Sequence, residues 1–139
     1  MKQYLMPLSG FKVVLVYCGI MFFGVVLLLI QDFIPILTGF ALIIFGLHEL
    51  GHILVLLKKN YDIVGIVISL WPPGGMGFMP DRPIDPQDSS SVYIFSGLVS
   101  IIVPFLIMYY TFIWGALFLT GTVFLSALDI WNWWQSRTR

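Results

Sequence analysis

The chain has 139 residues and no net charge, and 59% of its residues are hydrophobic while only 10% are charged. A soluble domain carries about 25% charged residues, so this composition excludes an ordinary soluble protein and predicts an integral membrane protein. The seven Lys and Arg residues lie near the ends of apolar segments and form no patch, which excludes a nucleic-acid partner. The lipid bilayer is the partner that the composition predicts.

Apolar segments, taken in chain order, predict four membrane-spanning helices. A helix needs about 20 mostly apolar residues to cross a bilayer, and two segments in the first half of the chain meet this length. A third segment, from Val92 to Trp134, is long enough for two crossings, and we expect it to reverse near Gly115. The expected helices are therefore at about 13–30, 36–57, 92–110 and 115–134.

A different pattern lies between the second and third expected helices. Residues Ile63 to Trp71 are rich in β-branched side chains and Pro72 to Gly75 is a turn signal, so we expect a short β-hairpin at about 63–79. A polar loop at 80–91 follows, rich in Pro, Asp and Ser. The expected fold is an all-α polytopic membrane protein, one domain over residues 1–139, with a membrane-associated hairpin between its second and third helices.

The basic residues predict how these helices are oriented, because Lys and Arg flank membrane spans preferentially on the cytoplasmic side. They come before the first helix, after the second and after the fourth, whereas the two opposite turns carry none. We therefore expect a multi-pass protein with both termini in the cytoplasm. The residues that carry this expectation are Lys2, Lys12, Lys58, Lys59, Arg137 and Arg139.

Both histidines and the only glutamate of the chain stand together in the second expected helix, as His48-Glu49-Leu50-Gly51-His52. An ionisable side chain at membrane depth costs about 2.5–3.5 kcal/mol, and a bound cation would compensate that cost. Positions i and i+4 share one face of a helix, so His48 and His52 can bind one ion with Glu49 beside it. Zinc would lower the pKa of a bound water to about 7, and Glu49 would be the base that accepts its proton. The alternative is a pair of core histidines bonded to the backbone or to each other.

A third ligand is needed, because catalytic zinc sites usually hold three protein ligands and leave one position for water. The chain has no third histidine and no second glutamate. Asp129 is the one acid within an expected span, and its distance from the cytoplasmic end of its helix matches that of His52. We therefore expect Asp129 to complete the site; the alternative is that it caps a helix end or pairs with Asn132.

These residues resemble the site-2 protease family of intramembrane zinc metalloproteases. In that family a membrane-embedded His-Glu-x-x-His helix is completed by the aspartate of a Leu-Asp-Gly motif, which Leu128-Asp129 matches here while Ile130 replaces the glycine. The family also places a β-hairpin after the motif helix, and Gly65 to Met79 is similar to it. The stretch from Ser96 to Val99 is similar to the family's Ser-Gly-Pro-Leu-x-Asn, without its proline and asparagine. The resemblance covers nearly the whole chain and identifies it as a minimal or divergent member.

The resemblance implies that the chain hydrolyses a peptide bond within or next to a transmembrane segment of another membrane protein. The hairpin would hold the unwound substrate by strand pairing. For its glycines a simple turn is the alternative, and for the polar candidates on the later helices the alternative is packing between helices. The expected substrate-binding residues are Ile66, Ile68, Gly74, Gly75, Ser100 and Asn132.

Two other functions compete with this one. A non-catalytic zinc-binding membrane protein, or an inactive relative of the proteases, would not need Glu49, because a structural metal site needs no general base. A transporter of divalent ions would need acids at several depths, and the expected spans hold one cluster. The small size of the chain also leaves room for a homo-oligomer.

Overall fold

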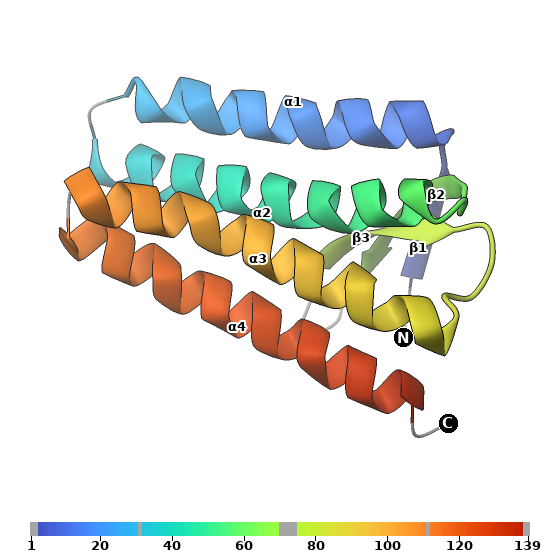
Figure 1. Ribbon diagram of the computed structural model, residues 1–139. Coiled ribbons are helices and arrows are strands. Elements are labelled where there is room, and N and C mark those ends of the chain that lie inside the picture. Colours follow the sequence, from blue (N-terminus) through green and yellow to red (C-terminus); the bar gives the residue numbers. More distant parts are fainter. Residues whose placement is uncertain (1–2, 31, 70–74, 111, 138–139) are drawn as a thin grey trace.

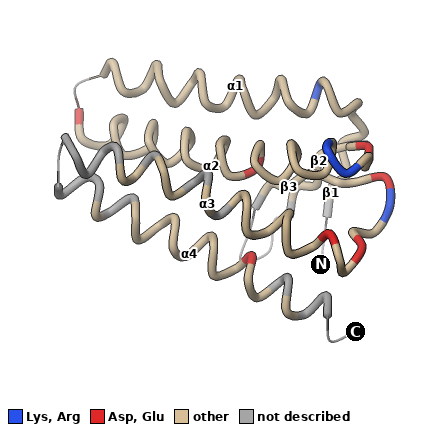
Figure 2. The backbone as a smooth tube through the Cα atoms, viewed as in Figure 1, with Lys and Arg blue, Asp and Glu red and all other residues tan. Residues whose placement is uncertain are grey.

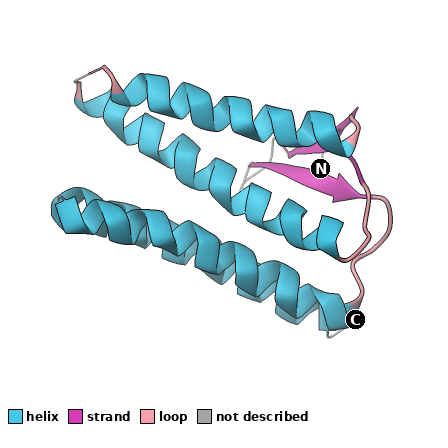
Figure 3. Cartoon of the chain, turned by 45° about the horizontal axis from the view of Figure 1, so that its top comes forward, coloured by secondary structure: helices cyan, strands magenta, loops and turns pink. Residues whose placement is uncertain are grey.

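The computed structural model describes residues 3–30, 32–69, 75–110 and 112–137, and these form four helices and three strands (Figure 1). The fold is mostly helical, with one small antiparallel sheet at one end of the helices (Figures 1 and 3). In chain order the elements are β1 (Gln3–Pro7), α1 (Gly10–Leu28), α2 (Phe33–Lys58), β2 (Ile63–Ser69), β3 (Gly75–Pro80), α3 (Pro86–Tyr110) and α4 (Phe112–Arg137).

The four helices are the four apolar segments that the sequence predicts. Helix α2 packs between α1 and α3, and α4 packs on α3. Among the described residues, two helices are long and apolar enough to cross a membrane, namely α1 and α2. A shorter apolar stretch, Leu119–Trp131, lies within α4.

Helix α3 begins earlier than the sequence predicts, because Pro86 starts it and Asp88 lies in its first turn. Proline is favoured at the first position of a helix, where its missing N–H would have no intrahelical partner. A negatively charged side chain in the first turn is favourable because it interacts with the positive end of the helix dipole. The polar loop expected at 80–91 is therefore much shorter, residues 81–85.

The sheet has three strands, whereas the sequence predicts a two-stranded hairpin. Strand β1, which the sequence analysis assigns to no element, pairs antiparallel with β2, and Leu5 lies opposite Val67. On its other side β2 pairs antiparallel with β3, and Ile66 lies opposite Phe78. The strand order is thus β1-β2-β3, with β2 in the centre. The predicted hairpin is confirmed as β2 and β3, and the description as all-α with one hairpin is incomplete because it lacks β1.

The buried core lies at the end of the bundle that carries the sheet. There side chains from α1, α2, α3, β2 and the α2–β2 turn pack on one another with almost no exposure. Figure 2 shows that Lys and Arg of the described residues gather at this same end. The core residues are Val13, Tyr17, Ile53, Leu56, Tyr61, Ile63, Ile66 and Val92.

Polar contacts join the end of α2 to the start of α3. The Tyr61 hydroxyl accepts a hydrogen bond from the Asp85 backbone N–H (3.0 Å) and donates one to Asp88 Oδ2 (3.2 Å). Lys59 Nζ lies 2.8 Å from Asp88 Oδ1, and this hydrogen bond holds the pKa of the Asp88 carboxyl below its usual range. Asn60 makes the turn between these groups with a positive φ of 61°. The contacts fix where α3 starts relative to α2.

Helices α1 and α2 cross where two glycines face each other. A Cβ atom added at Gly24 would lie 2.7 Å from the Gly39 carbonyl oxygen, and one added at Gly39 would lie 2.6 Å from the Gly24 carbonyl oxygen. Gly19, on the same helix as Gly24, would meet no heavy atom within 4 Å. Close backbone approach at small residues is a general device of membrane helix pairs.

We expect Gly24→Ala to lower the free energy of unfolding by about 1–3 kcal/mol, because the new methyl group overpacks the crossing against a backbone oxygen. The matched control is Gly19→Ala, which should be neutral or slightly stabilising because alanine has the higher helix propensity. Equilibrium unfolding of both variants in detergent measures the difference. Equal stabilities would show that the crossing tolerates a side chain.

Candidate metal centre

Three side chains from two helices converge inside the bundle. His48 and His52 lie one turn apart on α2, and Asp129 lies on α4. Asp129 Oδ2 is 3.1 Å from His48 Nε2 and 3.3 Å from His52 Nε2, and the two Nε2 atoms are 3.3 Å apart. All three residues are buried, at 3%, 5% and 8% exposure. The structure therefore brings together the three ligands that the sequence predicts, and Asp129 does not cap a helix end.

The spacing of these atoms fits a metal ion. In a tetrahedral site with metal–ligand bonds of about 2.0 Å, two ligand atoms are about 3.3 Å apart. The three distances here are 3.1, 3.3 and 3.3 Å, so the triangle has the size of one face of such a tetrahedron. Two imidazoles and one carboxylate are also a donor set that zinc accepts. The cluster could therefore hold a metal ion, by both its size and its chemistry.

The hydrogen bonding of His52 gives a second reason to expect a cation. Its Nδ1 lies 3.2 Å from the Val92 carbonyl oxygen, which can only accept, so Nδ1 carries a proton. In a neutral ring the lone pair of Nε2 then faces Asp129, and two acceptors in contact repel each other. A second proton on the ring would relieve one of the three contacts, whereas a metal ion would relieve all three.

Asp129 is supported from α3 as well. Ser96 Oγ lies 3.3 Å from Asp129 Oδ2 and 3.0 Å from the Tyr93 carbonyl oxygen, so its one proton can serve either acceptor. Helix α3 approaches this closely because Gly51 lies opposite Ser96: a Cβ at Gly51 would be 3.0 Å from the Ser96 Cα. The glycine inside the His-Glu-Leu-Gly-His motif thus makes room for the residue that bonds to the third ligand.

Glu49 is half-buried and is not part of the ligand triangle. Together with His52 it lines an open cavity of about 300 Å³, whose other lining residues come from β3, the 81–85 loop and α3. A carboxylate beside the ligands, facing a cavity, has the position that a general base requires. The other lining residues are Gly77, Phe78, Pro80, Ile84, Val92 and Tyr93.

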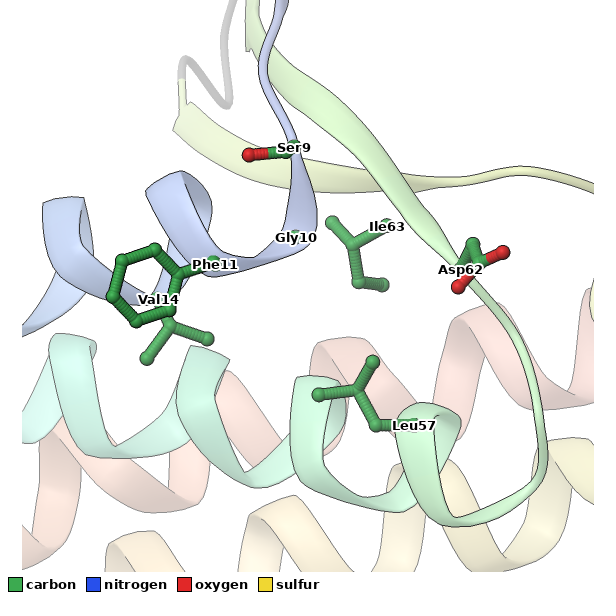
Figure 4. A pocket seen from close by; sticks show the side chains of 7 residues that line it. All are labelled: Ser9, Gly10, Phe11, Val14, Leu57, Asp62 and Ile63. Carbon is green, nitrogen blue, oxygen red and sulfur yellow. The ribbon is translucent and has the colours of Figure 1, made fainter.

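A larger cavity, of about 530 Å³, lies elsewhere, between the start of α1, the end of α2 and the start of β2 (Figure 4). None of its lining residues is a member of the metal cluster, and Glu49 does not line it. Its walls are mostly apolar, and its two polar side chains, Ser9 and Asp62, are not part of the metal cluster. The residues that line this cavity are Ser9, Gly10, Phe11, Val14, Leu57, Asp62 and Ile63.

The expected substrate-binding residues do not gather at the cavity beside Glu49. Ile66 is buried and Ile68 is half-buried on β2, whose two edges are both paired, so neither backbone is free to take an added strand. Gly75 begins β3. Gly74 lies outside the described residues, and the side chains of Ser100 in α3 and Asn132 in α4 lie outside what the structure describes.

Three residues near the cluster have roles that the sequence analysis does not assign. They are Ser96, the backbone carbonyl of Val92 and Tyr17, which lies near Glu49. A signal existed for Ser96, because the small residue Gly51 in the motif indicates a close helix contact there. For the other two, the contacts join residues far apart in the chain, and no local pattern predicts them.

We expect about one zinc ion per chain in protein purified in buffer without chelator. Asp129→Asn should lower this content strongly because the amide cannot supply the negative charge of the third ligand, whereas Glu49→Gln should retain it. Asp85→Asn, an exposed acid in the 81–85 loop, is the matched control. Elemental analysis of the four proteins measures the content, and zinc that Asp129→Asn leaves unchanged would remove Asp129 from the ligand set.

Comparison with models of known protein families, with curated proteins and with solved structures finds no match to this chain.

Proposed function

We propose that the chain is a zinc-dependent intramembrane metalloprotease, similar to the site-2 proteases, that hydrolyses a peptide bond within or next to a transmembrane segment of another membrane protein. One observation carries the proposal. The buried triangle of His48, His52 and Asp129 has the spacing of a zinc site, and Glu49 stands beside it at a cavity. A purely structural zinc site requires the triangle but neither the glutamate nor the cavity.

The proposal includes four membrane spans with both termini on the cytoplasmic side. Beyond the length of α1 and α2, its support is the apolar outer surface of all four helices, where large side chains are more than half exposed. Such surfaces are costly in water and favourable in lipid. Both ends of the chain also lie at the same end of the bundle as the sheet and the basic residues (Figures 1 and 2). Examples of the exposed side chains are Phe22, Phe33, Phe105 and Phe124.

In this mechanism His48, His52 and Asp129 would hold the metal, and Glu49 acts as the general base and then as the general acid. Bound zinc would supply a Lewis acid and make water a nucleophile at neutral pH. Glu49 accepts the proton of the attacking water and then donates it to the nitrogen that leaves when the peptide bond breaks. Phe78 and Tyr93 line the cavity beside Glu49 and give it aromatic walls.

The substrate must be unwound, because a helix hides its carbonyl groups in hydrogen bonds. Strand β3 is one of the two edge strands of the sheet, and its outer side pairs with no described strand. Of the two, β3 is the one whose residues, Gly77 and Phe78, line the cavity beside Glu49. We therefore propose that the substrate pairs with β3. The sequence predicts this pairing at Ile66 and Ile68, which lie on β2 instead. At Gly77 an added Cβ would meet no heavy atom within 4 Å, so the face of β3 is open at this residue.

The catalytic proposal predicts Glu49-dependent cleavage. Wild-type protein in lipid vesicles should cleave at least one of a panel of single-span membrane proteins, and Glu49→Gln should lower the rate by about 10²–10⁴-fold while its zinc content stays unchanged. A zinc chelator should abolish cleavage, and added zinc should restore it. Zinc-loaded wild type that is no more active than Glu49→Gln would instead favour the non-catalytic zinc-binding protein.

Strand pairing predicts an alternating effect of substrate N-methylation. Alternate residues of a strand point their N–H groups to the same side, so methyl groups scanned along the substrate should lower kcat/KM at every second position. One lost backbone hydrogen bond corresponds to a decrease of about three- to tenfold. The unmethylated substrate is the reference for each position. A smooth or random dependence on position would remove β3 pairing from the proposal.

A further inference from the structure

Tyr17 is a fully buried tyrosine of α1 that the mechanism above does not use. Its side chain has 0% exposure and packs among the core residues, and its ring centroid lies 6.0 Å from that of Phe45 on α2. For packing alone, a phenylalanine would serve as well. The question is therefore what the hydroxyl group does in this apolar surrounding.

The Tyr17 hydroxyl is buried and makes no hydrogen bond of regular geometry with any described residue. Tyr17 nevertheless lies against α2 near Glu49, because a Cβ added at Gly46 would be 3.4 Å from the Tyr17 carbonyl oxygen. Its hydroxyl is close enough to the Glu49 carboxyl group for the two to interact electrostatically. A buried hydroxyl without a partner destabilises a fold, so such a group calls for an explanation. Glu49 supplies one, because its carboxyl group is an acceptor close to this hydroxyl.

Tyr17 and the cavity lie on different sides of the Glu49 carboxyl group. Tyr17 approaches from α1 and is not among the residues that line the cavity, whereas His52, Phe78 and Tyr93 are. A carboxylate has two oxygens, and an oxygen that accepts a hydrogen bond from Tyr17 is held on the side of α1. The other oxygen is then held toward the cavity, where the water and the scissile bond would lie.

We propose that Tyr17 is a positioning residue for Glu49, whose hydroxyl donates a hydrogen bond to one carboxylate oxygen and thereby directs the other toward the cavity. This inference rests on the proposed protease function. It assigns a role in the reaction to a residue of α1, in addition to the residues of α2 and α4. No proton is transferred from Tyr17, and its role is to restrict the orientations of the base.

The variant that tests this is Tyr17→Phe, which removes one oxygen and keeps the ring. We expect kcat to fall about ten- to a hundredfold, as for one lost hydrogen bond to a charged group, with KM, zinc content and unfolding temperature unchanged. Tyr4→Phe, at an exposed tyrosine of β1, is the matched control and should keep full activity. A kcat within twofold of wild type, or a loss of zinc or of folded protein, would overturn the positioning role.

A second measurement does not depend on cleavage. A ¹³Cζ label placed at Tyr17 reports the hydrogen bonding of its hydroxyl by NMR, and we expect its resonance to shift between wild type and Glu49→Gln. An unshifted resonance would overturn the contact, whatever the activity. If wild type shows no Glu49-dependent cleavage, the protease proposal fails, and the resonance still decides whether Tyr17 bonds to Glu49. If wild type cleaves and Tyr17→Phe cleaves equally well, this inference alone fails.

Discussion

The contact between Asp129 and the two imidazoles is the interaction on which the arrangement of α4 depends. Helix α4 packs mainly on α3, and it touches α2 over only a small area. Within that area a carboxylate oxygen lies within 3.3 Å of two ring nitrogens, all of them buried. A buried carboxylate carries a high desolvation cost, and two neutral imidazoles offset only part of it. A cation in the triangle would therefore stabilise the bundle as well as serve the chemistry.

Such a site needs helix backbones that lie unusually close together, and glycines provide this at two levels of α2. At one level Gly39 meets Gly24 of α1, and at the other Gly51 meets Ser96 of α3. Apolar helices gain little from burying one another in lipid, so van der Waals contact between small residues becomes the main source of their association. The close contact between Gly51 and Ser96 also places the Ser96 hydroxyl beside Asp129. Packing and ligand support are thus one feature of α2.

The three residues of the candidate metal centre could be predicted from the sequence, because two of them are close in the chain and the third has few competitors. His48 and His52 share a helix face by spacing alone, and Asp129 is the one acid in an expected span. Strand β1 could not be predicted, because its pairing with β2 joins residues about 60 positions apart and its short apolar run has no distinctive period. The start of α3 was missed because Pro86 belongs equally to a loop and to a first helical turn.

The missed strand decides which edge of the sheet faces the cavity. In a two-stranded hairpin both strands would have one free edge, and Ile66 and Ile68 would be reasonable contacts for an added strand. Because β1 occupies the outer edge of β2, the free edge next to Glu49 belongs to β3, which carries Gly77 into the cavity wall. In the proposed protease the two ends of the described chain would serve one site: β1 would leave the β3 edge to an extended peptide, and α4 would complete the metal triangle. Helix α2, which lies between them in sequence, would carry the base.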